Sequence, residues 1–310
     1  MLIDHPLYKP LISNLLSWAQ EEPDIRAILV WGSTVRSLKP GAPGADLDLV
    51  IIAKQPHHYL DTAEWLANIG DSWLALPIRQ MLHGEKRKAL VHTAVFDERT
   101  ILDFAFCSPT AVRIGYFGTI MADNLPFLGR LLPTSLMETT HIFARIFRLG
   151  HKVLLDKDNW SWYVRRLTSL APRSPMPSQA QFHYTISQFF RYALCAATFQ
   201  RRKETWSAIH MLSCLTTGPL LQMLRWHAQA IQGEEVETWW QGKFIEDWVD
   251  KTFLEMLPGL FPRYDSTEIQ NALVSNLCLF DNVSQETAKA LGFSYPMTMA
   301  DKTKLAIQNP

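Results

Sequence analysis

The two halves of the chain have different hydrophobic periods, and this contrast limits the folds open to it. Before about residue 110, short apolar runs typical of buried strands occur over 26–32, 46–53, 89–96 and 101–106. Residues 97–100 separate the last two runs, which predicts a hairpin. Helical spacing of apolar residues is confined to 6–20 and 58–69 in this half. The N-terminal half is therefore expected to form a sheet with flanking helices.

Beyond residue 110, apolar residues recur every three to four positions, which predicts helices. The predicted helices cover 136–149, 180–200, 204–214, 219–231, 244–257 and 266–291. A stretch with three prolines, 171–178, is the best candidate for a break between elements. We predict an α+β protein with an N-terminal domain over residues 1–150 and a helical domain over residues 151–310.

Composition narrows the class of protein. The 310 residues are 47% hydrophobic and 19% charged, which is enough apolar material for sizeable cores. Lys and Arg together number 30, as do Asp and Glu, so the basic excess of a general nucleic-acid binder is missing and we expect no nucleic-acid partner. Four widely spaced cysteines favour buried thiols in a reducing compartment. Neither a signal-like segment nor a long apolar run is apparent, so we expect a cytoplasmic protein without a membrane span.

Aspartates on two predicted strands are the first candidates for chemistry. Asp46 and Asp48 alternate with leucines, so both carboxylates project from one face of their strand. Asp103 lies on a later strand and could complete a cluster. Oxygen ligands of this kind suit hard divalent cations, and three facing carboxylates repel one another unless a cation neutralises them. The pattern predicts a metal site for a phosphate-transfer reaction.

Gly32 and Ser33 end the first predicted strand and are candidates for binding phosphate. A glycine turn after a strand leaves backbone N–H groups free and admits close approach, which suits a triphosphate. Each feature alone is common: Gly-Ser turns are ordinary, most Asp-x-Asp pairs are solvated, and Asp103 could be a hydrogen-bonded core carboxylate. Their order along the chain, each on its expected strand, favours a nucleotide site.

This pattern resembles the DNA polymerase β-like nucleotidyltransferase superfamily. A closer similarity, to the aminoglycoside 6-adenylyltransferases (streptomycin adenylyltransferases), follows family order over most of the chain. It rests on residues 64–70, 101–106, 152–158, 202–212, 220–227, 242–249 and 294–296. The resemblance implies a mixed nucleotidyltransferase sheet with flanking helices, then a helical substrate-binding domain. It also implies Mg²⁺, ATP as co-substrate and a small-molecule acceptor.

The resemblance assigns roles to the N-terminal candidates. Gly32 and Ser33 would hold the β- and γ-phosphates. Asp46 and Asp48 would ligate Mg²⁺. Asp103 would complete the metal site or help to activate the acceptor hydroxyl. These five residues form the core of the predicted catalytic and nucleotide-binding site.

Further positions follow from the same resemblance. Lys157 matches a family segment near the domain junction and is assigned to nucleotide binding, as is Lys203, which could contact phosphate. Glu204 would bind substrate amines or serve as the base. The family has Gly-Ser-Arg at the phosphate turn, whereas here Arg36 follows two residues later and is expected to substitute. Gln188 stands where the family has a glutamate.

The predicted function is Mg²⁺-dependent transfer of AMP from ATP to a hydroxyl of an aminoglycoside such as streptomycin, and hence antibiotic resistance. The acidic stretch 234–255 would suit such a polycation, although a charge run is more often a solvated helix face. Three alternatives stay open: the same chemistry on another small molecule such as a lincosamide, adenylylation of a protein, and a catalytically silent nucleotide-binding module. The oligomeric state is not predicted.

Overall fold

The structure of the chain is a computed structural model. It describes residues 4–36, 44–78, 81–82, 85–86, 91–97, 100–124, 144, 147–170, 176–233, 235–238 and 240–308. The chain divides into two compact units, Met1–Pro172 and Arg173–Pro310. None of the described helices is both long and apolar enough to span a bilayer.

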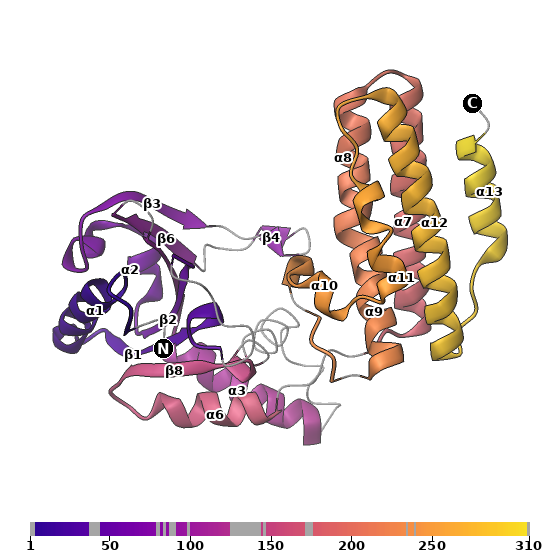
Figure 1. The fold of residues 1–310 in the computed structure, drawn as a ribbon. Coiled ribbons are helices and arrows are strands. Elements are labelled where there is room, and N and C mark those ends of the chain that lie inside the picture. Colours follow the sequence, from indigo (N-terminus) through magenta and orange to yellow (C-terminus); the bar gives the residue numbers. More distant parts are fainter. Residues whose placement is uncertain are drawn as a thin grey trace. The chain divides into compact units, whose positions relative to one another are not determined.

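The first unit is built on a six-stranded mixed sheet in the order β3-β6-β7-β2-β1-β8 (Figure 1). Its strands are Ile25–Trp31 (β1), Leu47–Ala53 (β2), Ser72–Ile78 (β3), Val91–Phe96 (β6), Thr100–Cys107 (β7) and His151–Asp156 (β8). A separate two-stranded ribbon joins Met81–Leu82 (β4) and Glu85–Lys86 (β5). Only the β2–β7 pair is parallel among the described strands, and this pair brings two predicted site segments together.

Helices cover both faces of this sheet. They are Lys9–Glu21 (α1), Pro56–Asp61 (α2), Pro109–Asn124 (α3) and Trp160–Leu170 (α6), with 3-10 turns at Gly32–Thr34 and Glu64–Asn68. Helix α1 buries Leu11 and Leu15 in the core on one face, beside the odd-numbered residues of β2. Helix α6 buries Trp160 and Val164 in the core on the other face. The alternation of β2 therefore sends Asp48 to the α6 face, on the same side as Val50 and Ile52.

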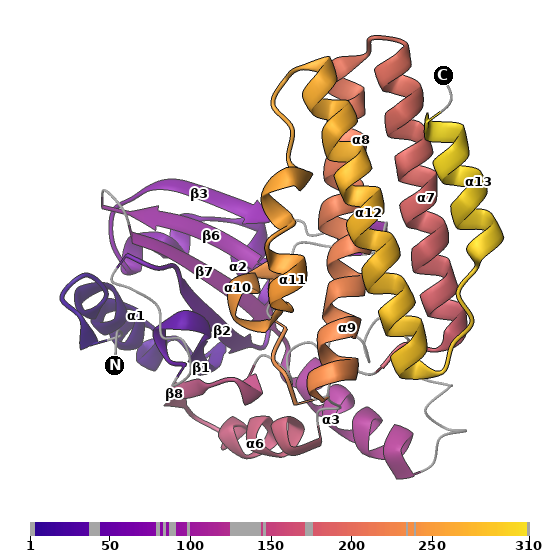
Figure 2. The same cartoon turned by 45° about the vertical axis from the view of Figure 1, so that its right-hand side comes forward.

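The second unit is helical (Figure 2). Its longer helices are Gln179–Arg201 (α7), Thr205–Leu215 (α8), Leu221–Gln232 (α9), Ser266–Leu291 (α12) and Met297–Gln308 (α13). Shorter helical segments are Trp240–Gly242, Ile245–Trp248 (α10), Lys251–Leu254 (α11) and Leu257–Leu260. In its core the rings of Phe189 and Phe280 stack at 3.6 Å between α7 and α12. Pro219 lies in a π-helical turn, Thr216–Leu220, that joins α8 to α9.

The predicted fold class is confirmed, as are the strands β1, β2, β6 and β7 and the hairpin between the last two. The predicted helix over 58–69 is wrong in extent, because an extended residue, Thr62, separates α2 from a 3-10 turn. The predicted helix over 244–257 is likewise divided into short pieces. Strands β3 and β8 were not predicted. Most of the helix predicted over 136–149 lies outside the described residues.

The boundary between the two units falls later than the predicted one at 150/151. Strand β8 adds to the edge of the first unit's sheet by pairing with β1. Helix α6 follows it and packs against α3. Residues 151–172 therefore belong to the first unit, and the division at 172/173 lies within the proline-rich stretch 171–178.

Candidate functional site

The sheet register places polar side chains in one cross-strand row. Asp48 of β2 pairs with Asp103 of β7 in the parallel register. Trp31 of β1 lies opposite Asp48, and Thr93 of β6 lies opposite Asp103. Directly opposed residues of paired strands share one face of the sheet. Four strands thus bring together segments from residue 31 to residue 103.

Asp46, Asp48 and Asp103 form the carboxylate cluster. Each offers an oxygen, and these three oxygens lie within 4.8 Å of one another. Asp46 is exposed just before β2 begins, and the other two are half-buried. Carboxylate oxygens are the ligands that Mg²⁺ prefers, and the exposed position of Asp46 leaves the cluster accessible to substrate phosphates. The structure therefore assembles the three aspartates that the sequence nominated.

The environment of Asp103 raises the pKa of its carboxyl. Burial is the main cause of a raised pKa for this carboxyl, and the negative charge of Asp46 adds to it. The hydroxyl of Thr93 donates to Oδ1 of Asp103 at 2.5 Å, which opposes the rise in pKa. A cation among the three carboxylates would offset both the burial and the repulsion.

Gly32 is required by the position of Asp48. Its φ is +81°, and a Cβ built on it would lie 2.2 Å from Oδ2 of Asp48. Any other side chain would displace that carboxylate. Ser33 follows in the same 3-10 turn and is 6% exposed. The Gly32–Thr34 turn and the carboxylate cluster are therefore in direct contact.

The residues after the turn pack closely on the chain before β8. Arg36 closes the turn through its backbone N–H, which donates to the carbonyl of Gly32 at 3.1 Å. Gly150 lies against this segment, and a Cβ there would approach the Arg36 Cα at 3.2 Å. Residues 37–43 lie outside the described part of the chain. The position of Arg36 beside the turn is compatible with its predicted role at the phosphates.

Lys157 is placed away from this cluster. It follows β8, whose residue Asp156 pairs with Ala27 near the start of β1, whereas Gly32 follows the end of β1. Its ammonium donates to the backbone carbonyls of Ala19 and Glu22 at 2.7 and 2.8 Å. These carbonyls belong to the C-terminal end of α1, where a cation is favoured. These contacts give Lys157 a structural role, and its predicted role in nucleotide binding stays a prediction.

Lys203 and Glu204 lie in the second unit, in the turn between α7 and α8. Both are exposed, and Lys203 has a positive φ of 63°. Glu204 is the N-cap residue of α8 and makes no side-chain capping bond. Gln188 is half-buried on α7, where its amide donates to the hydroxyl of Tyr184 at 3.1 Å. The roles of Lys203 and Glu204 stay predictions.

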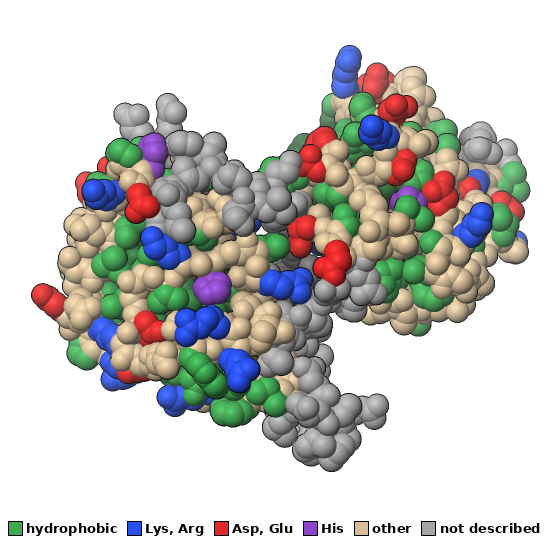
Figure 3. Space-filling model, turned by 60° about the horizontal axis from the view of Figure 1, so that its bottom comes forward, with side chains coloured by type: hydrophobic (Ala, Val, Ile, Leu, Met, Phe, Trp, Pro, Cys, Tyr) green, Lys and Arg blue, Asp and Glu red, His purple; other side chains and the backbone are tan. Residues whose placement is uncertain are grey.

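The acidic stretch is largely at the surface of the second unit, and Figure 3 shows acidic side chains exposed on that unit. Glu246, Asp247 and Glu255 are exposed. Asp250 is also exposed and caps α11 by accepting the N–H of Thr252 at 2.8 Å. The cap gives at least one of these acids a structural role.

Thr93 is the site residue that sequence reasoning missed. Its position follows from the register of the observed hairpin. With Phe96 opposite Thr100, the antiparallel register places Thr93 opposite Asp103. The predicted hairpin lacked this register, and a lone threonine in a strand carries no functional signal. The register of the hairpin is therefore the signal that could have located Thr93.

A family model and a relative that match this chain both describe adenylyltransferases. The model of the streptomycin adenylyltransferase family matches residues 8–308. An aminoglycoside 6-adenylyltransferase from Campylobacter jejuni is 21% identical over 290 residues, which cover 93% of this chain and 91% of that protein.

Two solved structures are similar to the chain at low identity. The crystal structure of an aminoglycoside 6-adenyltransferase from Bacillus subtilis has a TM-score of 0.42 and 16% identity, over 97% of this chain and 98% of that one. A nucleotidyltransferase-like protein from Exiguobacterium sibiricum has a TM-score of 0.35 and 12% identity, over 91% and 77%. The family match, which spans nearly the whole chain, is what decides its classification. The chain belongs to the streptomycin adenylyltransferase family, and is a nucleotidyltransferase.

Proposed function

We propose that this enzyme transfers AMP from Mg²⁺-ATP to a hydroxyl of an aminoglycoside. The observation that carries the proposal is the convergence of Asp46, Asp48 and Asp103 beside the Gly32 turn. Nucleotidyl transfer needs two features at one place: carboxylates that chelate cations and a glycine turn that admits phosphate.

The residues present fit a divalent cation. Three carboxylate oxygens within 4.8 Å of one another provide a set of hard anionic ligands. The carboxylate of Asp48 can hold its position only because Gly32 lacks a Cβ. Asp46 and Asp48 would ligate Mg²⁺, with Asp103 as third ligand. When bound, Mg²⁺ would neutralise charge that develops on the triphosphate during transfer.

The residues around this cluster would orient the nucleotide. Backbone N–H groups at Gly32 and Ser33 would bind the β- and γ-phosphates, with Arg36 nearby. The acceptor oxygen would attack the α-phosphorus, the bond to the bridging oxygen would break, and pyrophosphate would leave. Asp103 or Glu204 would accept the hydroxyl proton, and we keep both assignments open. Positioning and charge stabilisation would supply most of the rate enhancement.

The family name and the curated relative support an aminoglycoside as acceptor, and streptomycin is the first candidate. The acidic surface of the second unit is compatible with a polycation. Modification of such a compound would confer antibiotic resistance, and we place the reaction in the cytoplasm, where ATP is supplied. A lincosamide-like acceptor, a protein acceptor and a silent binding module are the competing proposals.

Pyrophosphate release from Mg²⁺-ATP is the test of the acceptor. It should be measured without acceptor, with streptomycin, and with a panel of aminoglycosides and lincosamides. We expect release that requires streptomycin or a close relative and that Asp46→Asn abolishes. Release with lincosamides alone would replace the acceptor but keep the chemistry. ATP binding without release for any acceptor would contradict the proposal and favour the silent module.

The base is tested by a pair of isosteric variants. If Glu204 is the base, Glu204→Gln should lower kcat by about 10²-fold and leave the Mg²⁺ requirement unchanged. If Asp103 serves instead, Glu204→Gln should keep kcat within about threefold of the parent enzyme, and Asp103→Asn should lower both turnover and Mg²⁺ affinity.

A further inference from the structure

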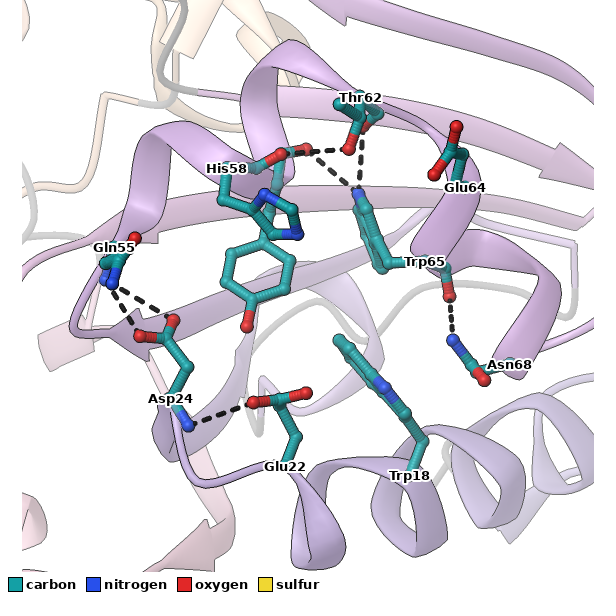
Figure 4. A pocket seen from close by; sticks show the side chains of 10 residues that line it. Trp18, Glu22, Asp24, Gln55, His58, Thr62, Glu64, Trp65 and Asn68 are labelled. Atoms are coloured by element: carbon teal, nitrogen blue, oxygen red, sulfur yellow. Dashed lines mark hydrogen bonds between the residues drawn. The ribbon is translucent and has the colours of Figure 1, made fainter.

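A cavity of about 420 Å³ lies in the first unit (Figure 4). Its volume is within the range of sites that bind small molecules, about 300–1,000 Å³. Its lining includes three aromatic and three acidic side chains: Trp18, Tyr59, Trp65, Glu22, Asp24 and Glu64. The nucleotide site proposed above uses none of them.

The cavity lies at the opposite end of the central strands from the carboxylate cluster. Asp24 precedes β1 and Gln55 follows β2 by two residues, and both line the cavity. Gly32 and Asp48 lie at the other end of the same two strands. A strand of seven residues separates the two ends by about 20 Å, so the cavity is no extension of the nucleotide site.

Aromatic rings form a rigid wall of this cavity. Trp18 stacks on Trp65 with ring centres 5.7 Å apart, and Tyr59 meets both rings edge-on at 6.0 and 5.9 Å. Tyr59 and Trp65 are 3% and 5% exposed. The indole N–H of Trp65 donates to the Tyr59 carbonyl at 2.9 Å, which fixes the ring. Trp18 is the half-buried ring of the three and offers the most surface to a ligand, and the negative face of an indole attracts organic cations.

Acidic side chains outnumber basic ones in the lining, which also includes one histidine, His58. Glu22 and Asp24 are half-buried and Glu64 is exposed, and no Lys or Arg belongs to the lining. Asp24 accepts the backbone N–H of Gln55 at 3.1 Å, and Glu22 accepts that of Asp24 at 3.1 Å. These neutral donors hold the carboxylates in place without cancelling their charge.

Two neighbouring basic side chains, Arg26 and Lys157, have other partners. The guanidinium of Arg26 is paired with the carboxylate of Asp158 at 2.5 Å. The ammonium of Lys157 donates to the backbone carbonyls at the end of α1, including that of Glu22. A cationic ligand would therefore supply the positive charge that a lining without Lys or Arg does not provide.

We propose that this cavity binds a small organic ammonium ion. Its positive charge would lie near Glu22 and Asp24, and its carbon skeleton would contact mainly the half-buried ring of Trp18. Aromatic faces combined with carboxylates suit an alkylated cation better than a hydrated metal ion, because the rings offer no ligand atoms. Anions are disfavoured by the three acidic side chains.

Choline and its uncharged isostere 3,3-dimethyl-1-butanol are matched probes, and butylamine tests a primary ammonium. The indole N–H resonances of Trp18 and Trp65, assigned with Trp18→Phe and Trp65→Phe, are followed by NMR in protein without nucleotide or acceptor. We expect saturable shifts with at least one of the two cations and at least tenfold weaker binding of the isostere. No saturable shift with either cation, or equal binding of the neutral isostere, would overturn the proposal.

Charge variants locate the cation. Glu22→Gln and the exposed Glu64→Gln should each weaken binding of the effective probe, Glu22→Gln by about fivefold or more. Glu21→Gln removes the same charge one residue away from the lining and should leave the dissociation constant unchanged. Equal effects of Glu21→Gln and Glu22→Gln would contradict a site at this cavity. Because the readout needs no ATP or acceptor, its failure would not affect the proposed transfer reaction.

Discussion

At the scale of single residues, the site depends on two close approaches. Gly32 leaves space for a carboxylate oxygen of Asp48 that a methyl group would fill. Thr93 contacts Asp103 from the neighbouring strand with a short hydrogen bond. One residue thus makes room for a candidate metal ligand and the other orients one, and each can be changed without altering charge.

Gly32→Ala should lower the rate of AMP transfer by about 10²-fold or more, while the protein stays folded. The new Cβ would lie 2.2 Å from Oδ2 of Asp48, so the carboxylate must move. Gly44→Ala is the control, because Gly44 also has a positive φ, +92°, but a Cβ there meets nothing within 4 Å. Pyrophosphate release measures the effect. Equal losses in the two variants would attribute the effect to backbone strain and contradict the proposed contact.

Thr93→Val should shift the pH dependence of divalent-cation binding to higher pH. The hydroxyl of Thr93 lowers the pKa of Asp103 against the raising effect of burial, so its removal lets that pKa rise further. The protonated carboxyl must then lose its proton at higher pH before it can bind a cation. Cation affinity measured from pH 5 to 8 tests this. Thr198→Val, at an exposed position of α7, is the control. An unchanged profile would contradict the role given to Thr93.

At the scale of elements, the sequence identifies strands whose pattern is strong and misses those at the edges of the sheet. β1 and β2 are nearly continuous apolar runs because both faces are buried, and Asp48, which interrupts β2, stands out for that reason. β8 is half-buried throughout, so it lacks both a buried run and a clean alternation. The pairing of Asp48 with Asp103 depends on strand register, which periodicity does not specify.

Lys157→Met should destabilise the first unit by about 1–2 kcal/mol. The ammonium of Lys157 bonds two carbonyls at the end of α1 and thereby joins α1 to the residue after β8. Lys152→Met, in β8 itself, is the matched control. Urea unfolding measures stability and initial rates measure the KM for ATP. A raised KM for ATP with unchanged stability would instead support a role of Lys157 in nucleotide binding.

At the scale of the whole molecule, the last helix of the second unit is held by interactions within that unit. In the second unit, Asp281 of α12 accepts from the hydroxyl of Tyr295 and the ammonium of Lys304, both at 2.7 Å. Burial alone would raise the pKa of Asp281, but these hydrogen bonds and the charge of Lys304 hold it below its ordinary value. α13 is thereby tied to α12 through an ionised group.

The stability of the second unit should therefore fall in acid. A carboxyl whose pKa is lowered by folding stabilises the protein fully above its unfolded pKa, and this contribution is lost as the pH falls through the folded pKa. Asp281→Asn should cost about 1–3 kcal/mol at pH 7 and remove this part of the pH dependence. Asp301→Asn, exposed on α13, is the control. Thermal unfolding measured from pH 2 to 7 tests this prediction. If the stability of Asp281→Asn had the same pH dependence as that of the parent protein, the role of this network would be refuted.

The most direct test of the carboxylate site is Mn²⁺ binding followed by electron paramagnetic resonance, with a non-hydrolysable ATP analogue present. Mn²⁺ stands in for Mg²⁺ at oxygen sites. We expect the parent protein to bind Mn²⁺ with the analogue, and Asp48→Asn and Gly32→Ala to weaken that binding at least tenfold, while Gly44→Ala leaves it unchanged. Binding that is equally tight in Asp48→Asn and the parent protein would show that these carboxylates do not hold the metal.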